Sequence, residues 1–187
     1  FIKHASDYGV EISGEVKADF EAIITRSRSV AEGMSKGIQY LFKKNKIEIL
    51  NGFGRIISRG EVEVDGENGK QNYNADSIII ATGARSKELP NLKQDGKKII
   101  GYREAMSLEK QPASMIVVGS GAIGSEFANF YNSMGTEVTL VEFLPNVVPN
   151  EDVEVSKQLA RSFKKAGMKV MVESSVESVD TSGELCK

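Results

Sequence analysis

The chain has 187 residues, of which 40% are hydrophobic, and a formal net charge of −2 from 24 lysines and arginines against 26 aspartates and glutamates. This length suits one large domain or two small ones, and the lack of a basic excess argues against a nucleic-acid partner. No apolar run approaches the roughly 20 residues that span a bilayer, and no signal-peptide pattern opens the chain, so we expect a cytoplasmic protein without membrane contact.

The two ends of the chain support two further expectations, one about disulfides and one about the length of the parent protein. The single cysteine, Cys186, excludes an internal disulfide and is compatible with a reducing cytosol. The chain begins at Phe1 rather than at methionine, in the middle of a pattern. We therefore expect a fragment of a longer protein.

A long amphipathic helix is predicted from its capping residue Asp19 to about Lys44. Asn45 can end it. Its apolar residues recur at helical spacing and predict a stripe that is buried in a core rather than a partner-binding face. These residues are Phe20, Ile23, Ile24, Val30, Ala31, Met34, Ile38, Leu41 and Phe42.

Short strands are predicted to follow the helix. Ile47–Leu50, Phe53–Ser58 and Glu61–Val64 have the composition of strands, and Asn68-Gly69 is a hairpin signal. The pattern predicts a small antiparallel meander.

A further strand, of the buried type, is predicted at Ala75–Ala81, and it ends at Thr82-Gly83. A glycine at such a strand end permits close approach of a ligand or simply allows a turn, and the residues alone favour the turn. Residues 84–112 are polar and broken by prolines, with one short helix expected at Tyr102–Leu108. This stretch is the candidate linker between two domains.

A glycine-rich motif follows the apolar strand Met115–Val118. Gly-x-Gly-x-x-Gly runs from Gly119 through Gly121 to Gly124, and a helix is predicted from Ser125 to Met134. In a dinucleotide-binding unit the first glycine makes the turn, the second admits a pyrophosphate, and the third packs helix against strand. The pyrophosphate then lies at the N-terminus of the helix.

The next strand, Glu137–Val141, ends on an acid, Glu142, about 20 residues past Gly121. This is the spacing of the carboxylate that binds a ribose 2′-hydroxyl. The loop of residues 143–149 has no positive charge to receive a 2′-phosphate, which favours NAD over NADP. The alternative is a βα turn that binds nothing, with Glu142 merely solvated.

A second helix and a third strand complete the pattern. Asp152 can cap a helix at Val153–Ala166, and Met168–Val172 follows as a strand. Strands that alternate with helices predict a right-handed parallel βαβαβ unit, and hence an α/β fold.

These segments resemble the lipoamide dehydrogenase branch of the two-dinucleotide-binding flavoprotein disulfide reductases. The resemblance rests on Asn51–Ile56, Ile78–Ala84 and Val118–Glu126, extended by Gly135, Val138, Thr139 and Glu142. It implies a Rossmann-like parallel βαβ NAD-binding domain at residues 113–187, incomplete at its C-terminal end. A partial FAD-binding domain at 1–88, made of the helix and the antiparallel meander, would precede it, with a linker at 89–112.

The resemblance also implies the cofactor-binding residues. For FAD they are Gly54, Thr82, Gly83 and Ala84. For NAD they are Gly119, Ser120, Gly121, Ala122, Ile123, Gly124, Ser125, Glu126, Glu142 and Val176. Val176 would line the adenine pocket. Glu126 would reach toward a lysine beside the flavin, although an acid in the first helical turn is also favoured by the dipole alone.

The implied function belongs to the parent protein. It would be a homodimer that reoxidises dihydrolipoamide on a carrier domain of a 2-oxo acid dehydrogenase complex, passing electrons through a disulfide and FAD to NAD. We expect no catalytic residue and no metal site in this stretch, because the redox cysteine pair and the His–Glu acid/base pair of the family are missing from it. The alternatives are a related disulfide reductase or NADH oxidase, or a non-catalytic NAD-binding module.

Overall fold

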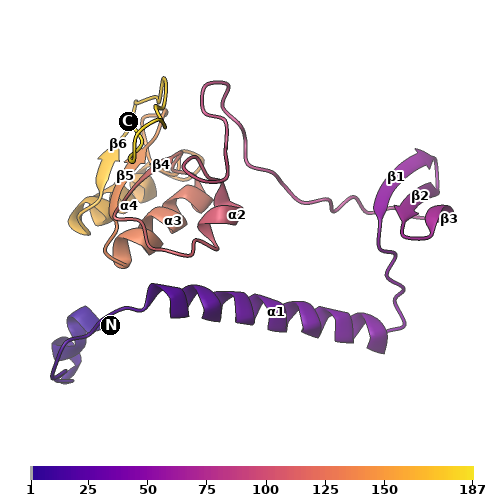
Figure 1. Cartoon of the computed structure of the whole chain (residues 1–187), viewed down its shortest axis with the longest axis horizontal. Coiled ribbons are helices and arrows are strands. Elements are labelled where there is room, and N and C mark those ends of the chain that lie inside the picture. The colour runs from indigo at the N-terminus through magenta and orange to yellow at the C-terminus, as the bar shows by residue number, and fades with distance from the viewer. Residues whose placement is uncertain (1) are drawn as a thin grey trace. The chain divides into compact units, whose positions relative to one another are not determined.

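The computed structural model describes residues 2–187, with side chains from residue 5 onward, and the chain divides into two compact units. One unit contains the residues up to Arg26 together with Glu88–Lys187, and we call it the βαβ unit. The other contains Ser27–Lys87, and we call it the meander unit. Figure 1 shows their elements in chain order. Among residues 2–187, no helix has both the length and the apolar character needed to cross a membrane.

The βαβ unit is built on a parallel sheet, as predicted. Its strands β4 (Ser114–Val118), β5 (Glu137–Val141) and β6 (Lys169–Met171) lie in the order β4-β5-β6. The register pairs Val118 with Val141 and Leu140 with Val170. Helices α3 (Ala122–Ser133) and α4 (Val153–Lys165) connect the strands. The α/β fold class predicted from the alternating pattern is confirmed.

Local sequence signals set the ends of these helices. The Oδ1 atom of Asp152 accepts a hydrogen bond from the backbone N–H of Glu154 at 2.8 Å, so Asp152 caps α4 as predicted. Gly135 and Gly167 follow the two helices with φ of +97° and +91°, a conformation that only glycine adopts without strain. Each helix can therefore turn directly into the next strand.

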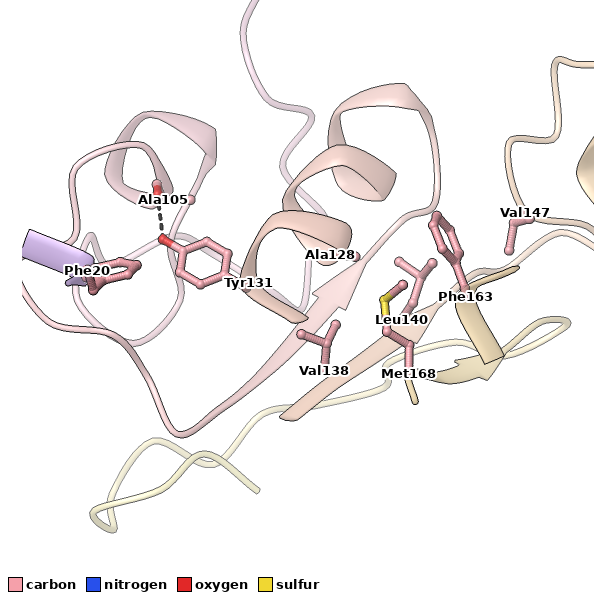
Figure 2. Close-up of a cluster of buried hydrophobic side chains, with 9 residues drawn as sticks. All are labelled: Phe20, Ala105, Ala128, Tyr131, Val138, Leu140, Val147, Phe163 and Met168. Carbon is pink, nitrogen blue, oxygen red and sulfur yellow. Dashed lines mark hydrogen bonds between the residues drawn. The ribbon is translucent and has the colours of Figure 1, made fainter. Parts of the chain in front are cut away.

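The core of the βαβ unit lies between the sheet and its helices, as Figure 2 shows. Leu140 and Val138 of β5 and Tyr131 of α3 are fully buried. The Tyr131 hydroxyl donates to the backbone oxygen of Ala105 at 2.6 Å, and burial raises the pKa of this hydroxyl. Ala105 ends the short helix α2 (Tyr102–Ala105), which forms inside the predicted linker and packs on this core.

The long helix α1 (Phe20–Lys44) begins one residue after Asp19, whose Oδ1 accepts from the N–H of Ala22 at 2.9 Å. The short 3-10 helix η1 (Ile2–Tyr8) precedes it. Phe20 is buried, with its ring centroid 6.0 Å from that of Tyr131.

The prediction that the apolar stripe of α1 is buried in a core is wrong for most of its members. Ile23, Ile24 and Phe42 are half-buried, and the remaining members, such as Met34, which is 67% exposed, face solvent. A helix face is buried only where another element supplies apolar surface, and the described part of the chain leaves this face uncovered.

The meander unit contains the antiparallel sheet that the sequence predicts. Strands β1 (Phe53–Ser58), β2 (Glu61–Gly66) and β3 (Gly69–Asn74) lie in that order, and the tight turn between β2 and β3 falls at Glu67-Asn68. Gly66 pairs with Gly69 across this turn. The strand expected at Ile47–Leu50 does not form.

The prediction of a buried strand at Ala75–Ala81 is wrong for this structure. The segment forms no strand beyond one bond, from the N–H of Ala75 to the backbone oxygen of Gly60 at 2.8 Å, and Ile79 and Ile80 are 90% and 71% exposed. A strand of this composition is stable when neighbours pair with its backbone and helices cover both its faces. The described residues provide neither here, so the apolar pattern alone does not produce the strand.

Candidate functional site

The glycine-rich loop connects β4 to α3 within three residues. Gly119 leaves the strand with φ +96°, and its N–H donates to the backbone oxygen of Val141 at 2.8 Å. Gly121 is the N-cap of α3, with φ −60° and ψ 177°, and has no side chain to cap the helix. The first N–H groups of α3 are thus left for another acceptor, and the helix dipole adds positive potential there.

The second and third glycines of the motif have opposite surroundings. A Cβ on Gly124 would overlap the backbone oxygen of Gly119 and lie 3.5 Å from Cγ1 of Val117, so helix and strand are in close contact there. A Cβ on Gly121 would meet no heavy atom within 4 Å. The space at Gly121 is therefore open to a ligand that approaches the backbone.

Ser120, between the first two glycines, is fully buried and is the centre of a hydrogen-bond network. Its N–H and its Oγ both donate to Oε2 of Glu142, at 2.8 and 2.7 Å. Its backbone oxygen accepts from Oγ of Ser125 at 2.9 Å and from the N–H of Val148 at 3.0 Å. Ser120 thus joins the glycine loop to the end of β5 and to the loop that follows.

Glu142 is only 7% exposed, and its carboxylate faces the glycine loop. Oε1 accepts from the N–H of Leu144 at 2.9 Å. Burial by itself would raise the pKa of Glu142, but the hydrogen bonds from the N–H groups of Leu144, Ser120 and Phe143 and from the Ser120 hydroxyl outweigh it and lower that pKa. The carboxylate is therefore a buried, stabilised negative charge.

The loop after Glu142 is held beside the glycine loop by Val148. This residue has φ +42°, which is strained for a β-branched side chain. Its N–H bonds to Ser120, and its backbone oxygen accepts from the N–H of Glu151 at 2.9 Å and from Oγ of Ser156 at 3.3 Å. The neighbouring Val147 is 1% exposed in the core. These contacts hold Val148 in its unfavourable conformation.

The sequence reasoning missed this network, although two signals for it were present. A hydroxyl residue stands between the first two glycines, and parallel pairing of β4 with β5 brings Ser120 and Glu142 to the same sheet edge. The strain at Val148 has no comparable signal in the sequence.

The other residues predicted to bind NAD lie around this edge in different environments. Ala122, Ile123 and Glu126 in the first turns of α3 are exposed, and Ser125 is buried. Val176 is half-buried, and its backbone oxygen accepts from Nδ2 of Asn91 at 2.9 Å. Their roles toward NAD stay predictions.

The residues predicted to bind FAD all lie in the meander unit. Gly54 is an exposed residue of β1, and Thr82, Gly83 and Ala84 are exposed after the segment that forms no strand. Gly83 has φ +77° and open space on the side where a Cβ would lie. The structure does not assemble these four residues into a site of their own, and their role toward FAD stays a prediction.

The chemistry available at the βαβ site is that of binding. The start of α3 offers N–H donors to an anion, and the Glu142 carboxylate offers an acceptor to a hydroxyl group. Among the side chains of residues 5–187, no three from His, Cys, Asp or Glu gather to hold a metal ion, and Cys186 is exposed.

The chain is similar to known proteins over almost its whole length. Residues 4–187 match the pyridine nucleotide-disulphide oxidoreductase family. The chain is 40% identical over 192 residues to a dihydrolipoyl dehydrogenase of Rhizobium etli, covering 95% of this chain and 40% of that protein. It is 39% identical over 184 residues to a leghemoglobin reductase of Vigna unguiculata, covering 97% of this chain and 35% of that protein.

Among solved structures, that of LpdA from Mycobacterium tuberculosis matches with a TM-score of 0.86 and 26% identity, covering 99% of this chain and 41% of that one. The chain thus spans about two fifths of the length of the first of these relatives.

Proposed function

Because the chain belongs to the pyridine nucleotide-disulphide oxidoreductase family, we propose that it is the central part of a dihydrolipoyl dehydrogenase and that its βαβ unit binds NAD. The similarity to a dihydrolipoyl dehydrogenase over 95% of the chain supports the first part. The second part is carried by one observation, the open backbone at Gly121 beside the buried carboxylate of Glu142.

The diphosphate of NAD fits the start of α3. Gly121 has no side chain in the way, and the uncapped N–H groups of the helix supply donors to the phosphate oxygens. Gly119 and Gly124 act indirectly, because the first makes the turn and the second lets α3 pack close to β4. Ala122 and Ile123 are exposed in the first turn of α3 and border the same space.

The adenosine ribose fits Glu142. Each carboxylate oxygen has about two acceptor positions. Oε2 accepts two hydrogen bonds from Ser120, whereas Oε1 accepts one from Leu144, and the N–H of Phe143 has the smallest effect of the donors that lower the pKa of Glu142. Oε1 can therefore take one more, from a ribose hydroxyl. The same negative charge would repel the 2′-phosphate of NADP, and the loop 143–149 has no cation to offset it.

In the parent protein, NAD bound here would accept a hydride from reduced FAD. Residues 1–88 would form part of the FAD-binding domain, with Gly54, Thr82, Gly83 and Ala84 against FAD, 89–112 the linker, and 113–187 the NAD-binding domain. Glu126 would face the nicotinamide side of the site and Val176 the adenine. The substrate would be dihydrolipoamide on a carrier domain of a 2-oxo acid dehydrogenase complex, and the parent a cytoplasmic homodimer.

Three alternatives remain within reach of experiment. The relative named leghemoglobin reductase is 39% identical to this chain, the same identity as one of the dihydrolipoyl dehydrogenases, so a related reductase with a different acceptor is one alternative for the parent. An NADH oxidase is another. Steady-state assays of the full-length parent with dihydrolipoamide, with other disulfides and with oxygen would rank these activities. The third alternative is that the chain by itself is an NAD-binding module without catalysis.

Calorimetric titration of NAD into the 187-residue chain tests the binding proposal. We expect weak but saturable binding, which Gly121→Val abolishes by filling the space at the backbone. The backbone of Gly121 has an ordinary φ of −60°, so this variant should keep its thermal stability. Unchanged NAD affinity in Gly121→Val would refute the placement of the diphosphate.

A further inference from the structure

We propose that Ser120 is a positioning residue that selects NAD over NADP by holding the carboxylate of Glu142 in one orientation. This inference rests on the proposed binding of NAD at the βαβ unit. It assigns to Ser120 a role that differs from contact with the cofactor, because the side chain is fully buried.

The geometry leaves the Ser120 hydroxyl with one partner for its only proton. A serine hydroxyl carries a single donor, and here it points to Oε2 of Glu142 at 2.7 Å. The N–H of the same residue points to the same oxygen at 2.8 Å. Two donors from one residue on one oxygen fix the rotation of the carboxylate. They also fill the acceptor positions of Oε2, so a ribose hydroxyl can bond only to Oε1.

Ser120 is itself held from two further sides. Its backbone oxygen accepts from the hydroxyl of Ser125 in α3 and from the N–H of Val148 in the following loop. These bonds thus fix the position of the Glu142 carboxylate relative to α3, the helix that would bind the diphosphate. A shift of Ser120 would move the ribose acceptor relative to the diphosphate donors, which would weaken a ligand that needs both.

The charge of Glu142 depends on the same contacts. Its bonding partners are neutral donors, namely backbone N–H groups and the Ser120 hydroxyl, and no lysine or arginine forms an ion pair with it in the described part of the chain. Burial raises the pKa of this carboxyl, and the bonds from Ser120 are among those that lower it. Without the hydroxyl, the carboxylate would be less fixed, so its charge would be held less firmly against a 2′-phosphate.

The test compares the affinities of the 187-residue chain for NAD and for NADP by calorimetry. We expect Ser120→Ala to reduce the preference for NAD by about tenfold, the size of one hydrogen bond to a charged group. Thr136→Val is the matched control, because the Thr136 hydroxyl is also buried and donates to the backbone oxygen of Pro112 at 2.8 Å, outside the network of Ser120 and Glu142. It should leave the preference unchanged.

A double-mutant cycle shows whether Ser120 acts through Glu142. Glu142→Gln should remove the preference for NAD, and adding Ser120→Ala to it should change nothing more. An unchanged preference in Ser120→Ala, or an added loss in the double variant, would overturn the proposal.

Carboxyl-carbon NMR titration of Glu142 separates this inference from the proposed function. Ser120→Ala should raise the pKa of Glu142 relative to the wild-type chain, whereas Thr136→Val should not. If the wild-type chain binds neither nucleotide, the proposed function fails. The titration still tests whether the Ser120 hydroxyl holds the Glu142 carboxylate. A raised pKa supports that hold, and an unchanged pKa overturns it.

Discussion

The two units of this chain differ in how completely their apolar segments are buried. In the βαβ unit, Val138 and Leu140 of β5 and Tyr131 of α3 are almost completely buried. In the meander unit, the equally apolar Ile78–Ile80 run is exposed and has no strand partner. The difference is that β5 has a neighbouring strand on each side and a helix that packs against it, all within the same short stretch of chain.

This contrast shows that an apolar run specifies a strand only together with its neighbours. The pairing of β5 with both β4 and β6 satisfies its backbone groups, and α3 packs against it. The Ala75–Ala81 run also contains consecutive β-branched apolar residues, Ile78–Ile80, but lacks these partners. The meander forms nevertheless, because a hairpin pairs strands that follow each other directly in the sequence.

The largest expected effect tests burial directly. Leu140→Ala should lower the free energy of unfolding of the βαβ unit by about 2–5 kcal/mol, because it leaves a cavity in a closed core. Ile79→Ala, at a residue of the meander unit that is 90% exposed, should change the free energy of unfolding of that unit by about 0.5 kcal/mol or less. Urea denaturation followed by circular dichroism measures both. Similar losses in the two variants would mean that Ile79 is packed in solution.

A pair of glycine substitutions should give the next largest difference. Gly124→Ala should cost about 1–3 kcal/mol, because the new methyl group overlaps the backbone oxygen of Gly119. Gly54→Ala in β1 meets no atom within 4 Å and should be neutral or stabilising by about 0.5 kcal/mol, since glycine is unfavourable within a strand. Thermal unfolding of both variants checks this. A stable Gly124→Ala would show that α3 and β4 are less tightly packed than the structure shows.

The two helix caps should give smaller effects that differ in kind. Asp152→Ala removes the cap of α4 and should lower the stability of the βαβ unit by about 1 kcal/mol, because Phe163 ties this helix to the core. Asp19→Ala removes the equivalent bond at α1, most of which is exposed beyond Arg26. Asp19→Ala should therefore reduce the helical circular dichroism signal of α1 rather than the stability of the βαβ unit. Loss of signal without loss of stability in Asp152→Ala would contradict the assigned packing of α4.

The smallest effect is expected from single carboxylates at acid pH. The pKa of Glu142 is lowered in the folded chain, so its stabilisation is complete above the unfolded-chain pKa and is lost as the pH falls through the folded-state pKa. The stability advantage of the wild type over Glu142→Gln should therefore shrink on acidification, as melting temperatures would show. Glu63→Gln in the meander unit breaks an exposed pair with Lys70 at 3.1 Å and should cost at most about 1 kcal/mol. An advantage that grows in acid would contradict the lowered pKa.

Much of the βαβ unit could be predicted from sequence, for the same reason that it folds. The predicted strands and helices between Met115 and Val172 agree with β4, α3, β5, α4 and β6 to within a few residues at each end. Each element has its partner nearby in the sequence, so local pattern and tertiary packing agree. The predicted strand at Ala75–Ala81 and most of the stripe on α1 failed because their burial depends on surfaces that a local pattern does not contain.

The candidate site was predictable in composition but not in contacts. The spacing of Gly119, Gly121, Gly124 and Glu142 brought these residues to one edge of the sheet, as the structure has them. It did not indicate that Glu142 bonds to Ser120, because spacing sets which residues meet and not how their atoms pair. The left-handed backbone of Val148 depends on contacts with Ser120, Glu151 and Ser156 from three different segments.

The loop of residues 143–151 contacts the site through its main chain. Leu144 and Val148 donate through their backbone N–H groups, while the side chain of Phe143 is 73% exposed. Mutational tolerance should follow this division. A combinatorial library at Phe143 and Asn146 should yield mostly folded variants, and directed evolution could thus reshape the rim of the site while its anchoring bonds stay intact.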